Sequence, residues 1–212
     1  MFVLVKRHMM QMYDNSTGHI IADIGGKLML VDTGAAKTFY DEYQGLRIND
    51  LSRMLGQPLD GVLGMDSIKG KVLSITRDSI DFNAVAPDQK GAPLHYISGI
   101  PCVDIKINEV PCRAVISTGA ATSYISEALI SKDKYTRSIH DMHPSYGNSS
   151  VKMFVNYFSI SNKSYFAEAG ELPAEFALPS STGVDAIIGM DVLDRFDLIM
   201  DFSDNRLHLI SN

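Results

Sequence analysis

The pattern of apolar and polar positions predicts two similar halves built mainly from strands. Apolar runs on either side of Gly25-Gly26 are typical of a hairpin with a tight turn. One helix is expected in the first half, capped at Asn49 or Asp50 and ended by Gly56. The expected strands occupy residues 20–24, 27–32, 71–75, 79–82, 100–107, 110–116, 198–202 and 207–210. This content predicts an all-β class with short helices.

The chain is expected to form a first lobe at 1–82, a linker at 83–94 and a second lobe at 95–212. The linker assignment depends on its proline and glycine residues among polar neighbours. The second lobe holds an additional segment, in which a polar run at 145–150 precedes alternating apolar residues. This segment predicts a long hairpin with its tip near Tyr146-Gly147.

A repeat relates the two halves. Leu30–Ala36 contains Asp32-Thr33-Gly34, and Val115–Ala121 contains Ser117-Thr118-Gly119. Each copy is followed by a second motif, at Asp60–Asp66 and at Asp185–Asp191, in which two apolar residues precede Gly-Met-Asp. Order and sequence agree in both copies, so the chain is interpreted as an internal duplication.

Charge and hydropathy argue against two classes of binding partner, nucleic acid and membrane. The net charge of −6 and the scattered basic residues argue against nucleic acid, whose binding needs clustered Lys and Arg. No apolar stretch reaches the roughly 20 residues that span a bilayer, so no membrane partner is expected. The N-terminal charges follow a short apolar run, the reverse of a secretory signal, which predicts a cytoplasmic protein.

The two cysteines are predicted to stay reduced. If Asn108-Glu109 forms a hairpin tip, Ile105 faces Cys112, and Cys102 lies three residues from Ile105 on the opposite face of the sheet. A disulfide is geometrically poor in that register. We therefore expect two buried thiols.

The repeated motifs resemble the aspartic protease superfamily, both its bilobal pepsin-like and its dimeric retropepsin-like members. A single Asp-Thr-Gly would be weak evidence, because turns favour Asp and Gly. Two copies with the same order of motifs are specific. The resemblance implies two related lobes of aspartic-protease β-barrel type with a cleft between them, a peptide or protein substrate, and no cofactor.

The resemblance also implies roles for individual residues. Asp32 and Ser117 occupy the positions of the two catalytic carboxylates. Thr33 and Thr118 would exchange hydrogen bonds between the loops, while Gly34 and Gly119 would permit close backbone approach. Tyr146 and Gly147 look like the tip of a flap that closes over a bound peptide; a plain surface hairpin is the alternative.

Ser117 stands where the chemistry requires a second carboxylate. In aspartic proteases two carboxylates share one proton, so that one activates water and the other donates to the scissile carbonyl. A serine hydroxyl is too weak an acid for that role. Without the partner charge, the pKa of Asp32 is expected near its ordinary value, and single-chain hydrolysis should be impaired.

Three interpretations remain open. The first is a non-catalytic homologue that binds peptides or another protein through the cleft, as a binding or regulatory module. The second is a protease whose dyad forms between the Asp32 residues of a homodimer. The third is the descendant of an active parent in which Ser replaced Asp, naturally or by engineering. The homodimer is disfavoured because the repeat suggests that the two lobes already pair within one chain, and an Asp32–Asp32 dimer would leave the Ser117 lobes unpaired or force a different arrangement.

Other chemistry is less well supported by the sequence. Ser117 as a nucleophile would need a positioned base, and only His140 or His143 are candidates. The same two histidines have metal-like spacing but lack further ligands, so no metal site is expected. Asp66 and Asp191 are interpreted as caps of short helices.

Overall fold

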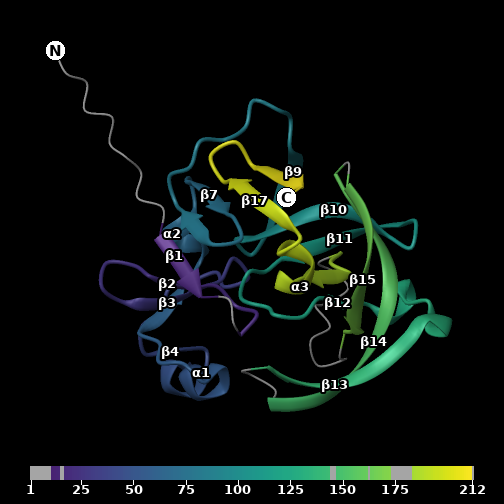
Figure 1. The fold of residues 1–212 in the computed structure, drawn as a ribbon, viewed down its shortest axis with the longest axis horizontal. Coiled ribbons are helices and arrows are strands. Elements are labelled where there is room, and N and C mark those ends of the chain that lie inside the picture. The colour runs from purple at the N-terminus through teal and green to yellow at the C-terminus, as the bar shows by residue number, and fades with distance from the viewer. Residues whose placement is uncertain (1–10, 15–16, 144–146, 162, 173–182, 212) are drawn as a thin grey trace.

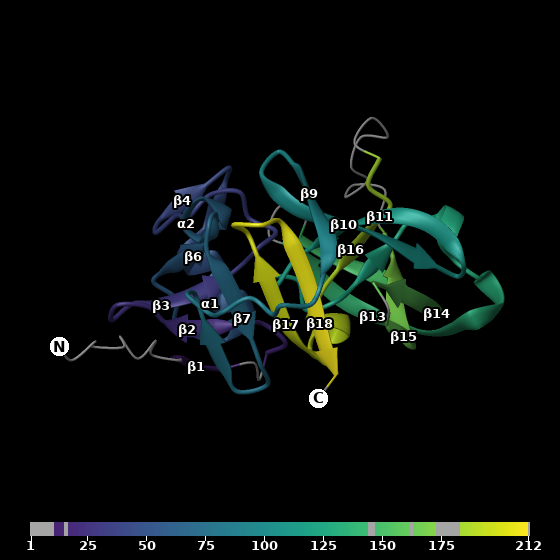
Figure 2. The ribbon, with the colours of Figure 1, turned by 90° about the horizontal axis from the view of Figure 1, so that it is seen from above.

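The computed structural model describes residues 11–14, 17–143, 147–161, 163–172 and 183–211. Two lobes of strands lie side by side, and the C-terminal strands run between them (Figures 1 and 2). The fold is all-β with short helices, as the sequence predicted. The pairings link sixteen strands into one continuous order, from β13 at one end to β6 at the other.

Eight strands and two helices lie within the part of the first lobe that the structure describes. In chain order they are β1 (Gln11–Asp14), β2 (Ile21–Asp23), β3 (Leu28–Val31), β4 (Glu42–Tyr43), β5 (Leu46–Arg47), α1 (Ile48–Leu55), β6 (Gly61–Leu63), α2 (Met65–Ile68), β7 (Val72–Ile75) and β8 (Ser79–Asp81). The predicted hairpin at Gly25-Gly26 is the β2–β3 pair, in which Ala22 lies opposite Met29.

The predicted helix begins earlier than expected. Helix α1 starts at Ile48, and neither Asn49 nor Asp50 caps it. The N-cap is Arg47, and the backbone N–H of Ile48 donates to the carbonyl of Asp41 at 2.9 Å, which satisfies one of the N–H groups that the first turn leaves free. The helix ends at Gly56 as predicted, because this residue has the left-handed φ of 67° that favours glycine.

The described residues of the second lobe form ten strands, one α-helix and two 3-10 helices. These are β9 (Ala92–Ile97), β10 (Ile100–Ile107), β11 (Val110–Ile116), β12 (Tyr124–Ile125), η1 (Glu127–Leu129), η2 (Lys132–Lys134), β13 (Tyr135–His143), β14 (Gly147–Ile160), β15 (Lys163–Glu171), β16 (Ala186–Ile188), α3 (Met190–Leu193), β17 (Phe196–Asp201) and β18 (Arg206–Ser211).

The linker is shorter than the expected 83–94. Residues 83–91 contain neither helix nor strand, but Ala92–Ile97 form β9. Strand β9 pairs with β10 on one side and with β18 on the other, and its residues Ala92 and Leu94 are buried. Burial of these two side chains explains why a proline-containing segment becomes a strand.

The C-terminal strands join the two lobes. β17 pairs with β7 of the first lobe, and Met200 lies opposite Leu73. β18 pairs with β17 on one side and with β9 on the other. One apolar core therefore runs through both lobes, and it includes Ile20 of the first lobe and Ile188 of the second.

The register predicted for the cysteines is confirmed. Ile105 pairs with Cys112, Cys102 pairs with Val115, and both thiols are free. Cys102 is buried, whereas Cys112 is only partly buried, which corrects the expectation for that residue. Burial raises the pKa of both thiols, that of Cys112 to about 12, so they remain protonated at neutral pH.

Candidate active site

Two equivalent loops meet where the lobes face each other. Asp32 directly follows β3, and its backbone N–H donates to the carbonyl of Leu63 at 3.0 Å. Ser117 directly follows β11, and its N–H donates to the carbonyl of Ile188 at the same distance. In both lobes the supporting strand is parallel, β6 beside β3 and β16 beside β11. The duplicated sequence thus folds into duplicated backbone.

Thr33 and Thr118 connect the two loops. The Thr118 hydroxyl accepts from the Thr33 N–H at 3.1 Å and donates to the carbonyl of Val31 at 2.8 Å. The Thr33 hydroxyl accepts from the Thr118 N–H at 3.1 Å and donates to the carbonyl of Ile116 at 2.7 Å. Both side chains are fully buried, so each hydroxyl satisfies two backbone groups that water does not reach.

The glycines allow the loops to approach. A Cβ on Gly119 would lie 2.2 Å from Cγ of Asp32, and a Cβ on Gly34 would lie 2.5 Å from Oγ of Ser117. Both distances are far below van der Waals contact. Any side chain at either position would push the loops apart.

Asp32 and Ser117 are in direct contact. The Ser117 hydroxyl donates to Oδ1 of Asp32 at 3.1 Å. The same oxygen accepts from the backbone N–H groups of Gly34 at 2.6 Å and Gly119 at 3.1 Å. No hydrogen bond to Oδ2 is formed by the part of the chain that the structure describes. The carboxylate is therefore held by one oxygen, and the other is available to a water or ligand.

The pKa of Asp32 departs from the expectation of an ordinary value. Burial raises it, and this effect outweighs the hydrogen bonds from Gly34, Ser117 and Gly119 and the nearby His19, all of which lower it. The sequence argument considered only the missing partner charge. Desolvation by the surrounding loops supplies a shift in the same direction as a second carboxylate would.

His19 lies near this site and was missed from the sequence. Its Nδ1 is 2.9 Å from the carbonyl of Thr17, and its charge interacts with Asp32 and with Asp141. Burial lowers the pKa of His19, so the ring is neutral over more of the pH range than an exposed histidine. No sequence motif indicates a role for His19, because its proximity to Asp32 depends on the path of the chain into β2.

A second symmetric pair supports the loops from behind. Asp66 accepts hydrogen bonds from the backbone N–H and the hydroxyl of Thr38. Asp191 accepts from the same two groups of Ser123. The N-cap positions belong to Gly64 and Gly189, and the two acids lie in the first turn of their helices, so they are not N-cap residues. They tie each loop to its short helix.

The predicted long hairpin is present as β13 and β14. Its register runs from Tyr135 opposite Phe154 to His143 opposite Gly147 (Figure 1). Asp141, near the tip, interacts electrostatically with His19, so this end of the hairpin is directed toward the Asp32 side of the lobe. Tyr146 lies outside the described residues, and its role as a flap residue stays a prediction; Gly147 is the first residue of β14.

The described residues give Ser117 no histidine base and place no metal-ligand cluster around the histidines. Ser117 forms no hydrogen bond with a histidine of the described segments, and His140 lies on β13 opposite Ser150. The described residues contain no group of three or more His, Cys, Asp or Glu side chains placed to hold a metal ion. No described helix is long and apolar enough to cross a membrane. Two cavities lie in the second lobe, and neither is lined by Asp32 or Ser117.

The paired lobes, crossed threonines and facing loops define an aspartic-protease fold. Among solved structures, the crystal structure of an aspartic proteinase from Irpex lacteus matches this chain with a TM-score of 0.59 and 11% sequence identity. The match covers 96% of this chain and 97% of that one, so both lobes are included. No protein-family profile and no curated protein sequence matches the chain. The likeness is therefore one of fold.

Proposed function

We propose that the chain is an aspartic-peptidase homologue that binds extended polypeptide between its lobes and has little hydrolytic activity as a single chain. The contact between Ser117 and Asp32 carries this proposal. The position that would hold the second carboxylate carries a hydroxyl instead, and that hydroxyl already donates to Asp32. A lone carboxylate can accept a proton from water, but no equivalent acid protonates the scissile carbonyl.

Two functions compete within this proposal. A binding or regulatory module would use the same surface without cleavage. A homodimeric protease would pair two Asp32 residues, but it would first have to release the four threonine hydrogen bonds that join Asp32 and Ser117 loops within one chain. This cost favours the single-chain binding module. Solution mass separates the two, since a strict monomer excludes the Asp32–Asp32 dyad.

Cleavage of a diverse peptide mixture tests the proposal. Mass spectrometry between about pH 4 and pH 7 would compare the chain with Asp32→Asn and Ser117→Asp variants. We expect little cleavage by the chain and a gain of about 10²–10⁴-fold in Ser117→Asp, the usual contribution of a positioned acid or base. The double variant Asp32→Asn/Ser117→Asp should lose this gain.

Each contrary outcome has a clear meaning. Efficient cleavage by the unmodified chain that disappears in Asp32→Asn would refute impaired activity and make an unconventional dyad the question. An inert Ser117→Asp variant that still captures peptides would favour the binding module. An inert variant that captures none would reject the proposed function as a whole.

A further inference from the structure

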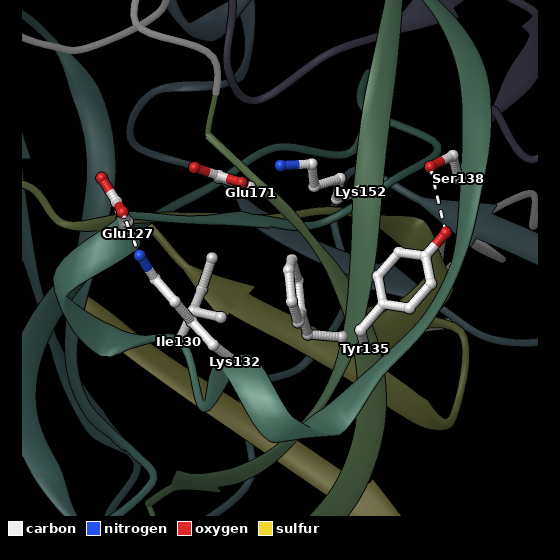
Figure 3. A pocket seen from close by; sticks show the side chains of 8 residues that line it. Glu127, Ile130, Lys132, Tyr135, Ser138, Lys152 and Glu171 are labelled. Carbon is white, nitrogen blue, oxygen red and sulfur yellow. Dashed lines mark hydrogen bonds and ion pairs between the residues drawn. The ribbon is translucent and has the colours of Figure 1, made fainter.

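A cavity of about 350 Å³ lies in the second lobe, away from Asp32 and Ser117. It is formed where η1 and η2 lie against the base of the β13–β14 hairpin and the end of β15 (Figure 3). This volume falls within the range of small-molecule sites. The cavity has no part in the proposed peptide chemistry, so it requires its own explanation.

The floor of the cavity is apolar. Ile130 and the buried Phe154 contribute to it, and the ring of Tyr135 packs edge-on against Phe154 with 5.8 Å between ring centroids. Tyr135 remains 52% exposed, which leaves aromatic surface open to a ligand. An apolar group placed here would lose contact with water on several sides, which favours its binding.

The rim carries two charges of each sign. Glu127 and Lys132 form an ion pair with 2.5 Å between Oε1 and Nζ. The pKa of Glu127 is lowered mainly by the hydrogen bond from Lys132, and Lys152 contributes to the same effect. The charge of Glu171 likewise acts on Lys132. The four charged groups therefore surround one space, and their sum is zero.

Lys152 and Glu171 are the two rim charges that form no ion pair among the described residues. Met153 of β14 and Gly170 of β15 form the last pair of these antiparallel strands. Lys152 directly precedes Met153, and Glu171 directly follows Gly170, so the two lie next to that pair. In Figure 3 the ammonium and carboxylate ends face each other across the top of the cavity. No ion pair joins them, so each end can still bind an opposite charge.

We propose that this cavity binds a small zwitterion with an ammonium group, a carboxylate and one apolar side chain, as in a free α-amino acid or a dipeptide. Lys152 binds the carboxylate, Glu171 binds the ammonium group, and the side chain lies on Ile130, Phe154 and Tyr135. A simple anion would face Glu127 and Glu171, and a simple cation would face Lys132 and Lys152. A ligand with both charges meets attraction at each end.

Calorimetric titration of the full chain with L-phenylalanine tests the proposal. Phenylalaninamide lacks the carboxylate, 3-phenylpropanoate lacks the ammonium group, and glycine lacks the side chain. Each is expected to bind at least about tenfold more weakly, the cost of one charge-assisted contact or of the apolar contact. Phenylalanyl-alanine separates the two sources, since its charges are farther apart than those of the free amino acid.

Variants locate the site. Lys152→Gln and Glu171→Gln should each weaken L-phenylalanine binding about tenfold or more, while Lys106→Gln and Glu42→Gln, exposed on β10 and β4, should leave it unchanged. Circular dichroism checks that each variant is folded, and methyl NMR of Ile130 reports occupancy directly. Binding by none of the zwitterions, equal binding of the singly charged analogues, or unaltered binding in both cavity variants would each overturn the proposal, whatever the peptidase assays give.

Discussion

The Asp32 loop and the Ser117 loop have the same backbone but different chemistry. Each follows a central strand, bonds to a parallel neighbour, and gives one threonine hydroxyl to the other lobe. The difference is one side chain, a carboxylate against a hydroxyl. The comparison teaches that these two loops hold together without a carboxylate on each side, because backbone groups and threonines join them.

The segments that follow the two loops differ more. Gly64 follows Asp32 by 32 residues, and the segment between them contains the β4–β5 pair and α1. Gly189 follows Ser117 by 72 residues, and that segment contains the long β13–β14 hairpin. The carboxylate and the candidate flap thus belong to different lobes. A closed peptide site would need both.

The largest expected effect comes from breaking the threonine link. Thr118→Val and Thr33→Val should each reduce the free energy of unfolding by about 2–5 kcal/mol, since each leaves a buried N–H and a buried carbonyl unpaired. The two losses should be similar if the loops are equivalent. Urea unfolding measures them, with Thr136→Val as the matched control, since Thr136 is an exposed residue of β13 whose hydroxyl makes a single part-buried bond, to the Met153 carbonyl at 3.2 Å. Losses no larger than the control's would show that the link contributes little.

A smaller effect should distinguish the two glycines. Gly119→Ala and Gly34→Ala are expected to cost about 1–3 kcal/mol by overpacking. Gly119→Ala should be worse, because the Asp32 carboxylate is fixed by three donors. The double variant Gly34→Ala/Ser117→Ala should recover part of the loss, since it removes the nearest atom. Additive losses in this double-mutant cycle would contradict the close approach of Gly34 and Ser117.

The charge of Asp32 should appear in the pH dependence of stability. Its pKa is raised by burial, so its contribution to stability is complete below the ordinary pKa and is lost as pH rises through the folded-state pKa. The Asp32→Asn variant lacks this loss of stability with rising pH, because asparagine does not ionise. Its melting temperature relative to the unmodified chain should therefore increase from about pH 4 upward. Asp88→Asn, an exposed control, should show no such trend; a decrease for Asp32→Asn at neutral pH would contradict the assignment.

The smallest effect concerns His19. Its positive charge lowers the pKa of Asp32, so His19→Gln should raise that pKa further. The change should be confined to acid pH, where the ring is protonated, because burial lowers the pKa of His19. A carboxyl-carbon NMR titration of Asp32 measures it, with His140→Gln as the control. An unchanged titration in His19→Gln would remove His19 from the site.

Local sequence order predicted the parts of this fold that depend on neighbours along the chain. The β10–β11 register could be derived from one turn, whereas the contact between the Asp32 and Ser117 loops was implied only by the resemblance to aspartic proteases. The strand at Ala92 and the pairing of β17 with β7 could not, because they depend on surfaces made by distant segments. His19 and the raised pKa of Asp32 were missed for the same reason: both arise from burial that only the assembled lobes create.

The pairing of β17 with β7 also constrains the order of folding during synthesis. Until β17 has been made, Val72–Ile75 has β8 on one side and no partner on the other, so it is an open edge. Such edges invite pairing with other chains. The first half therefore cannot complete its sheet as it emerges, and its last neighbour arrives only with residues 196–201. A ribosome-bound chain would depend on rapid completion, or on a chaperone, to keep this edge covered.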